Sequence, residues 1–238
     1  MNIILFEESE FKKPFSKYDP RMKHVLKILK CGVGDEFDMG IINGRVGKAH
    51  IKRKFDDKIE LKYSLGNEIP EMFPVTLVVG HPRPRSLRRI LREATCLGVS
   101  EICFVGTEKG EKSYRDTKVW KNDNFRQLLI DGAQQGFSTR IPNIKRYLSL
   151  DDYLEEIPKY TTRICLDNYE TDICLRDCAS NRNDYILAIG SERGWSQKER
   201  QLFREHNFLI ARLGERILRT DTACISALSI LFSKLKYM

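Results

Sequence analysis

The sequence predicts an α/β protein in which a parallel sheet follows a small β-rich domain. From Pro74 onward, short apolar runs alternate with amphipathic stretches, a pattern typical of strands joined by helices in a parallel sheet. Before residue 70, short alternating runs are bounded by Gly, Asn or Asp, as in a small antiparallel barrel. Residues 66–74 contain glycine and two prolines and are the predicted linker.

The first region is expected to hold four strands and one helix. Apolar residues recur at helical spacing in Pro20–Leu29, and the turn Gly32–Asp35 ends this predicted helix. The predicted strands cover residues 3–6, 36–39, 45–51 and 58–63.

The second region is expected to alternate strands with helices. Ser196 and Glu199 form a plausible capping box at the start of one helix. The predicted strands cover residues 75–79, 101–105, 163–166, 185–189 and 208–213. The predicted helices cover residues 86–97, 122–136, 196–206 and 221–235.

The composition favours a soluble cytoplasmic protein with an anionic partner. The 238 residues carry a net charge of +8, and basic proteins attract phosphates. No apolar run reaches the roughly 18 to 20 residues that span a bilayer, and the start of the chain lacks a secretory signal. The seven cysteines include no Cys-x-x-Cys pair, so we expect free thiols and no metal.

Two basic clusters are candidates for contact with phosphate. Five arginines fall within residues 83–92, and only Glu93 lies nearby to neutralise them. Phosphate contact and a solvated helix face both remain open for this cluster. A second cluster lies in the first region, where exposed lysines are also common on ordinary surfaces. It comprises Lys12, Lys13, Lys17, Arg21, Lys23, Lys27 and Lys30.

Two glycine-containing loops near the C-terminus are the strongest candidates for a ligand site. Gly190–Gly194 follows one predicted buried strand, and Leu213–Ala223 follows another. Open α/β sheets bind ligands at the carboxyl ends of their strands. The first loop matches neither the dinucleotide fingerprint nor the Walker pattern. The second concentrates six polar residues between two apolar elements, and buried polar groups require partners.

These loops closely resemble those of a SPOUT methyltransferase family that methylates N3 of a uridine in 16S ribosomal RNA. That family has Ile-Gly-Pro-Glu-Gly-Gly in the first loop and Leu-Gly-x-Arg-Ile-Leu-Arg-x-Glu-Thr-Ala in the second. Here the loops read Ile-Gly-Ser-Glu-Arg-Gly and Leu-Gly-Glu-Arg-Ile-Leu-Arg-Thr-Asp-Thr-Ala. Further matches follow in chain order at residues 24–36, 94–99, 135 and 140–142.

The resemblance implies a fold, a cofactor and partners. It implies a PUA-like, RNA-binding β-barrel over residues 1–72 and a SPOUT methyltransferase domain over residues 73–238, with a deep trefoil knot within about 185–238. It implies a homodimer that uses S-adenosylmethionine and acts on the ribosomal RNA of the small subunit. The implied cofactor-binding residues are Ile189, Gly190, Gly194, Leu213, Gly214, Ile217, Leu218, Arg219 and Thr220. The expected RNA-binding residues are Arg21, Lys23, Arg85, Arg88, Arg140 and Arg193.

The chemistry of this reaction suggests roles for polar residues of the loops. Uracil N3 must lose its proton, and negative charge on the ring must be stabilised. Asp221 and Glu192 are the candidate proton acceptors, and Arg219 or Arg216 could stabilise the charge. An ion pair between Arg219 and Asp221 that braces the fold is the alternative.

Departures from the family keep two other functions open. The first loop has Ser191 and Arg193 where the family has proline and glycine, and Gln134 and Ser138 replace a glutamate and an arginine. The first alternative is a methyltransferase for a different RNA base or a different RNA. The second is an RNA-binding factor that kept the fold and lost catalysis.

Overall fold

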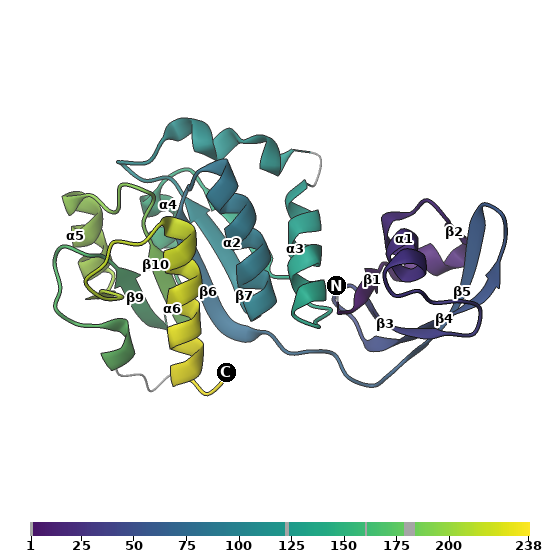
Figure 1. Cartoon of the computed structure of the whole chain (residues 1–238). Coiled ribbons are helices and arrows are strands. Elements are labelled where there is room, and N and C mark those ends of the chain that lie inside the picture. Colours follow the sequence, from purple (N-terminus) through teal and green to yellow (C-terminus); the bar gives the residue numbers. More distant parts are fainter. Residues whose placement is uncertain (1, 122–123, 160, 179–183) are drawn as a thin grey trace. The chain divides into compact units, whose positions relative to one another are not determined.

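The computed structural model describes residues 2–121, 124–159, 161–178 and 184–238. The chain divides into two compact units. Unit 1 contains Met1–Glu71 and Ile130–Ile141, and unit 2 contains Met72–Leu129 and Pro142–Met238. Each unit is built around its own sheet (Figure 1).

Unit 1 has a five-stranded sheet in the order β1-β3-β4-β5-β2. The four predicted strands are confirmed, but the expectation of a purely antiparallel arrangement is wrong, because β1 pairs with β3 in parallel. The intervening chain, which holds β2 and α1, is long enough for that crossover. The bounds are β1 Ile4–Phe6, β2 Phe15–Ser16, α1 Pro20–Lys27, β3 Glu36–Ile41, β4 Val46–Lys54 and β5 Lys58–Leu65.

Helix α1 forms where the sequence predicts it. The Asp19 side chain accepts a hydrogen bond from the Arg21 backbone N–H, and Pro20 occupies the first turn, where its missing N–H costs nothing. Met22 and Val25, one turn apart, are fully buried against the sheet. The helix therefore closes the core of unit 1.

Residues 130–141, far along the chain, complete unit 1. Helix α3, Asn124–Gln135, confirms the expected helix, although residues 122–123 lie outside the described residues. The Leu5 backbone N–H donates to Gln134 Oε1 at 3.1 Å, and the Thr139 hydroxyl donates to the Gly44 carbonyl at 2.6 Å. Gln134 is only 2% exposed. Its amide therefore has a structural role beside β1.

Arg21 lies at the centre of an ion cluster in unit 1. Its guanidinium pairs with Glu10 at 2.6 Å and with Asp19 at 2.8 Å, and it lies over the ring of Phe6 at 4.7 Å. The hydrogen bond from Arg21 holds the pKa of Glu10 below its ordinary value. Arg21 was an expected RNA-binding residue, but in the structure its guanidinium is engaged in ion pairs within unit 1.

Unit 2 has a six-stranded sheet in the order β11-β9-β10-β6-β7-β8, and every strand pair in it is parallel. This confirms the parallel α/β class for the second region. The strands are β6 Phe73–Gly80, β7 Val99–Val105, β8 Asn143–Tyr147, β9 Thr162–Leu166, β10 Tyr185–Ile189 and β11 Leu209–Ala211. The helices are α2 Pro84–Leu97, α4 Leu150–Glu155, α5 Gln197–Glu205 and α6 Thr220–Lys234.

Helices cover both faces of this sheet. One cluster joins Val78 of β6 to Tyr153 of α4 and Phe203 of α5. Leu77 and Val79 alternate with Val78 and are also fully buried, so they face the opposite side, where α2 packs against α6. Their full burial explains the uninterrupted apolar run in the sequence.

Strand β8 and helix α4 were not predicted. In β8 no residue is buried, so it lacks the apolar run of the central strands, as expected for an edge strand. Helix α4 has only six residues, too few for a periodic pattern, although Ser149 and Asp152 form its capping box.

No helix among the described residues has the length and apolar character needed to span a membrane. The described chain offers no group of three or more His, Cys, Asp or Glu side chains that could hold a metal ion. All seven cysteines are free.

We expect the variant Glu10→Gln to destabilise unit 1 by about 1–2 kcal/mol at neutral pH, because Arg21 loses a charge-assisted partner. The lowered pKa of Glu10 means that the wild-type advantage is complete above the ordinary value of 4.5 and is lost as the pH falls below it. Amide hydrogen exchange of β1 and α1 measures the difference. An equal difference between the two proteins at pH 7 and at pH 3 would contradict this assignment.

Candidate functional site

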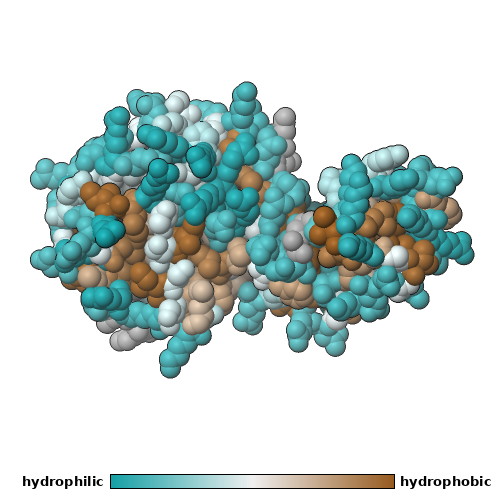
Figure 2. Space-filling view, in the orientation of Figure 1, coloured by the Kyte–Doolittle hydropathy of each residue, from teal (hydrophilic) through white to brown (hydrophobic). Residues whose placement is uncertain are grey.

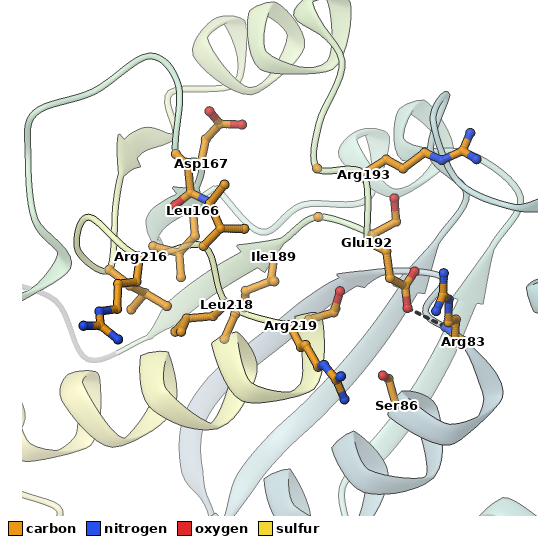
Figure 3. Close-up of a pocket in the computed structure, with 18 of the residues that line it drawn as sticks. Arg83, Ser86, Leu166, Asp167, Ile189, Glu192, Arg193, Arg216, Leu218 and Arg219 are labelled. Atoms are coloured by element: carbon orange, nitrogen blue, oxygen red, sulfur yellow. Dashed lines mark hydrogen bonds between the residues drawn. The ribbon is translucent and has the colours of Figure 1, made fainter.

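A cavity of about 630 Å³ lies at the carboxyl edge of the parallel sheet in unit 2. Three chain segments that follow β9, β10 and β11 line it, together with the start of α2. Because the carboxyl ends of parallel strands meet at one edge, segments distant in sequence converge here (Figure 3).

The first glycine loop forms one wall. Its Gly194 N–H donates to the Ser191 carbonyl at 2.9 Å, and Gly194 has the left-handed φ of 66°, which favours glycine. A Cβ on Gly190 would lie 2.9 Å from the Gly194 Cα, so the loop folds back on itself closely. The loop therefore presents backbone rather than side chain at its turn.

Glu192 of this loop reaches the start of α2. Its Oε1 accepts a hydrogen bond from the Arg83 backbone N–H at 2.8 Å (Figure 3). A carboxylate at a helix N-terminus interacts favourably with the helix dipole. This contact fixes the loop with its carboxylate beside the cavity.

The second loop forms the facing wall. Leu213, Ile217 and Leu218 supply apolar surface, and Ile217 is 75% exposed. Arg219 precedes α6, and its side chain extends toward Ser86 of α2 in Figure 3. Thr220 and Ala223 complete this side from the first turn of α6.

The third wall was not predicted. Leu166, Asp167, Asn168 and Tyr169 follow β9 and line the cavity. The sequence did contain a signal for this wall. Residues 163–166 were predicted as a strand of the same parallel sheet, so the residues that follow that strand must lie at the same edge.

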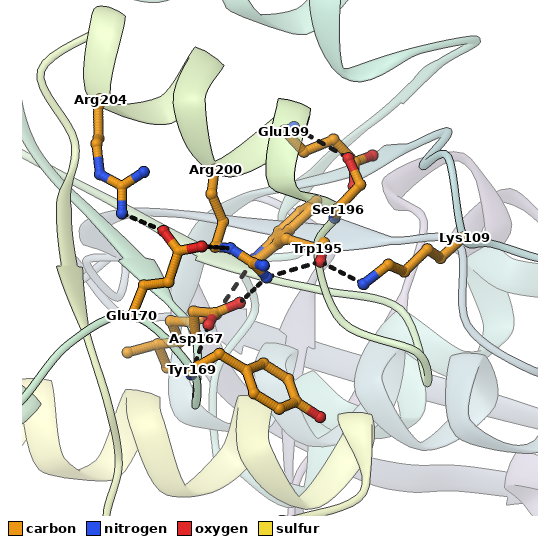
Figure 4. Close-up of polar contacts among 10 residues, drawn as sticks. Lys109, Asp167, Tyr169, Glu170, Trp195, Ser196, Glu199, Arg200 and Arg204 are labelled. Carbon is orange, nitrogen blue, oxygen red and sulfur yellow. Dashed lines mark hydrogen bonds and ion pairs between the residues drawn. The ribbon is translucent and has the colours of Figure 1, made fainter.

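Arg200 of α5 joins the first and third walls (Figure 4). Its guanidinium donates to the Trp195 carbonyl at 2.9 Å, pairs with Asp167 at 3.3 Å and bonds Glu170 at 2.9 Å. The Trp195 indole N–H also donates to the Leu166 carbonyl at 3.1 Å. Two loops from different strands are therefore held together by one buried cation and one buried ring.

The turn into α5 confirms the predicted capping box. The Ser196 hydroxyl accepts from the Glu199 N–H, and the Glu199 carboxylate accepts from the Ser196 N–H. Glu199 also accepts from the Glu108 N–H at 2.8 Å. Lys109 donates to the Trp195 carbonyl at 2.9 Å, so the segment after β7 braces the same loop.

The structure brings most of the predicted site residues together. Gly214 does not contribute to the cavity lining, although its neighbour Leu213 does. The lining includes the predicted residues Ile189, Gly190, Glu192, Arg193, Gly194, Leu213, Arg216, Ile217, Leu218, Arg219 and Thr220, and also Arg85 from α2.

Asp221 lies outside this lining. It is 6% exposed and pairs through Oδ2 with Arg89 of α2 at 3.3 Å, while its Oδ1 is buried without a hydrogen-bond partner. The alternative, an ion pair between Arg219 and Asp221, is not formed among the described residues, because Asp221 pairs with Arg89 instead. Since Thr220 and Asp221 form the first turn of α6, helix packing directs this carboxylate toward α2.

The cavity carries an excess of positive charge. Five arginines line it, against the carboxylates of Asp167 and Glu192. Arg200 already neutralises Asp167, and Arg193 extends away from the other labelled side chains in Figure 3. The lining arginines are Arg83, Arg85, Arg193, Arg216 and Arg219.

Helix α2 extends this basic surface. Leu87, Ile90, Leu91 and Ala94 are buried as predicted, and hydrophilic side chains cover the outer face of the helix in Figure 2. That exposed face carries Arg85, Arg88, Arg89 and Arg92. Three expected RNA-binding residues lie in unit 1. Arg21 is held in its ion cluster, Lys23 is exposed, and Arg140 is partly buried, with its Nε lacking a partner.

His81 does not belong to this surface. It is 4% exposed at the end of β6, and burial lowers its pKa to about 4, so the ring is neutral at physiological pH. Its Nε2 lacks a hydrogen-bond partner. The run that begins at His81 therefore divides into a buried imidazole and exposed arginines.

A glycine-lined cavity at the carboxyl edge of a parallel sheet, flanked by arginines, indicates a protein that binds a small ligand beside an anionic partner. Comparison with known proteins gives the class. A family model described as an RNA methyltransferase domain matches residues 69–232.

Relatives of nearly equal length give the family. The chain is 36% identical to the ribosomal RNA small subunit methyltransferase E of Treponema pallidum, over 98% of this chain and 91% of that protein. It is 34% identical to methyltransferase E 1 of Borreliella burgdorferi, over 99% of each chain. The chain belongs to the ribosomal RNA small subunit methyltransferase E family.

A solved structure shares the fold. The Neisseria gonorrhoeae ribosomal RNA small subunit methyltransferase E, bound to S-adenosyl methionine, matches 98% of this chain and 97% of its own. The TM-score is 0.76 at 18% sequence identity.

We expect Arg200→Met to destabilise unit 2 by about 3–5 kcal/mol, because the Asp167 side chain, 2% exposed, is left buried without its cation. Arg204→Met is the matched control. Arg204 pairs with Glu170 but its side chain is 42% exposed, so its loss should cost less than about 1 kcal/mol. Urea unfolding followed by tryptophan fluorescence measures both, and equal costs would contradict the role given to Arg200.

Proposed function

We propose that this protein transfers a methyl group from S-adenosylmethionine to the 16S ribosomal RNA of the small subunit. Membership of the methyltransferase E family over nearly the whole chain carries this proposal. The position of the cavity supports it, since the two loops that resemble the family line one site.

The cavity suits S-adenosylmethionine. Its volume of about 630 Å³ is in the range of small-molecule sites. Leu166, Ile189 and Leu218 offer apolar surface for an adenine ring, and the glycine loop leaves backbone groups accessible. The arginines complement the carboxylate of the cofactor.

In this proposal the two loops hold the cofactor mainly through backbone and apolar contacts. Gly214 is the least supported member, because it lies outside the cavity lining. The proposed cofactor-binding residues are Ile189, Gly190, Gly194, Leu213, Gly214, Ile217, Leu218, Arg219 and Thr220.

The proposed target atom is N3 of a uridine. Bound S-adenosylmethionine supplies an electrophilic methyl group. The protein must take the N3 proton and stabilise the negative charge that develops on the uracil oxygens. Glu192 lines the cavity and Asp221 does not, so Glu192 is the better-placed proton acceptor. Arg219 is exposed on the facing loop and is positioned to stabilise the negative charge on the uracil oxygens.

The unusual first loop is compatible with catalysis. Arg193, Gln134 and Ser138 were the reasons to consider an inactive RNA-binding factor, and the bulky cation of Arg193 could close the cavity. Its side chain extends away from Leu166, Ile189 and Leu218 in Figure 3. Gln134 and Ser138 both lie in unit 1, and Gln134 is in its core. We therefore place Arg193 among the RNA contacts, with Arg85 and Arg88.

The remaining architectural proposals follow the family resemblance. They are a PUA-like RNA-binding barrel over residues 1–72, a SPOUT domain over residues 73–238, and a trefoil knot within about 185–238. The strand order supports the knot proposal, since β10 lies between β9 and β6 while β11 lies outside β9.

A homodimer is proposed as well. Apolar residues gather on the face that carries α6 in Figure 2, and Ile217 and Leu218 are exposed beside it. Exposed apolar surface of this kind marks protein contacts. A sedimentation mass of one chain at micromolar concentration would contradict the dimer.

Methyl transfer tests the function directly. Radiolabelled S-adenosylmethionine is incubated with small subunits from cells that lack this modification, and the RNA nucleosides are resolved by mass spectrometry. We expect label in 3-methyluridine of 16S RNA. Label in another nucleoside would overturn the N3 assignment alone, whereas no label in RNA at any salt concentration would overturn the enzyme.

We expect Gly190→Ala to weaken S-adenosylmethionine binding about tenfold or more, because the added Cβ would meet the Gly194 backbone at 2.9 Å and displace the loop. Gly32→Ala is the control, since the nearest atom to its Cβ lies at an ordinary 3.5 Å. Calorimetry measures both affinities, with circular dichroism to verify folding. An unchanged affinity for the folded Gly190 variant would exclude this loop from the cofactor site.

We expect Glu192→Gln to lower kcat for methyl transfer about 100-fold, the scale of a lost general base, with cofactor affinity changed less than threefold. The amide oxygen can still accept the Arg83 N–H, so the loop is preserved. Asp221→Asn is the comparison and should lower kcat less than tenfold. A larger kcat loss in the Asp221 variant would reverse the two assignments.

A further inference from the structure

Tyr18 is an exposed aromatic residue on a rigid turn of unit 1. It lies between β2 and α1, and 65% of its surface is exposed. It belongs to none of the hydrophobic clusters of the unit. Because the ring is exposed and its hydroxyl is polar, its face is available to a stacking partner.

Hydrogen bonds on both sides hold the Tyr18 backbone in place. The Tyr18 N–H donates to the Ser16 hydroxyl at 3.2 Å, and the Asp19 N–H donates to the Ser16 carbonyl at 3.0 Å. The Lys17 N–H donates to the Asp57 carbonyl at 2.9 Å. Arg21, fixed by Asp19 and Glu10, anchors the far side. The ring is thus presented from a preorganised backbone.

Two lysines flank the ring. The Nζ atoms of Lys17 and Lys23 each lie 5.9 Å from its centroid, near the outer limit of a cation–π contact, so neither covers the ring closely. Lys17 Nζ donates one of its three N–H groups to the Asp56 carbonyl at 2.8 Å. The ammonium group of Lys23 makes no hydrogen bond or ion pair with any described residue.

We propose that Tyr18 stacks against an unpaired base of the RNA substrate while Lys17 and Lys23 contact the phosphates beside that base. Aromatic rings bind single-stranded nucleic acid by stacking on bases, with cations along the backbone. A base within a duplex has both faces covered, so this site selects a single-stranded or bulged nucleotide. The inference rests on the proposed RNA substrate and adds a contact outside the catalytic cavity.

The full-length chain is compared with Tyr18→Ala and Tyr18→Phe for binding to a fluorescein-labelled single-stranded RNA of mixed sequence. We expect the alanine variant to bind about tenfold more weakly, because the stacking surface is lost. The phenylalanine variant keeps the ring and should stay within twofold of wild type. Ile28→Ala, which truncates an apolar residue of 67% exposure at the end of α1, is the matched control and should not change affinity.

The charges are tested by salt dependence. In Lys17→Gln/Lys23→Gln, the slope of log affinity against log salt should become shallower by about 1.4, since two phosphate contacts on a single strand are removed. The proposal is overturned if Tyr18→Ala binds the RNA like wild type, or if Tyr18→Phe loses as much as Tyr18→Ala. It is also overturned if Tyr18→Ala affects only assembled subunits and not free RNA, because the ring would then contact a ribosomal protein.

This measurement is separate from catalysis. Loss of RNA binding without loss of S-adenosylmethionine binding would support the stacking site. In methyl transfer we expect the alanine variant to raise KM for small subunits about tenfold, with kcat unchanged. If wild-type protein transfers no methyl group to RNA, the proposed function fails, while the binding comparison still decides the role of Tyr18.

Discussion

The buried cation of Arg200 is the interaction on which the candidate site most depends. Loops at strand ends lack the regular hydrogen bonds of the sheet, so their positions need other partners. Arg200 supplies them to the segments after β9 and β10 at once, through Asp167 and the Trp195 carbonyl. Burying such a cation is costly unless it is paired and hydrogen-bonded, and the planar guanidinium suits several acceptors in one plane. A lysine could not make the same set of contacts.

The sheet and its helices were largely accessible from the sequence. Central strands such as β6 are buried on both faces and therefore read as continuous apolar runs. Helix α2 has a regular apolar stripe, and α5 begins at a capping box that the structure reproduces. Edge strand β8 and the short helix α4 carry no such pattern, and the parallel pairing of β1 with β3 depends on long-range contacts that local sequence does not encode.

Part of the candidate site was also predictable, because its loops follow strands that the sequence predicts. Loops that follow predicted strands of one parallel sheet must meet at one edge, so most lining residues could be named in advance. The directions of single side chains could not. Asp221 lies two residues from Arg219, yet the start of α6 directs Asp221 into an ion pair with Arg89 and leaves Arg219 in the cavity lining. Arg21 looked like one more surface cation, and only the fold brings Glu10 and Asp19 to it.

The order of the chain and its division into units do not coincide. Ala133 packs with Ile3 and Leu5, and Gln134 and Thr139 bond to β1 and to the turn after β3. A fragment cut after residue 71 would therefore expose apolar surface and leave the Leu5 N–H without its acceptor. A fragment that starts at residue 72 would carry residues 130–141 without the strands they pack on. Neither half can be isolated by a single cleavage, and a separately folding unit 1 would need residues 130–141 reattached through a new connection.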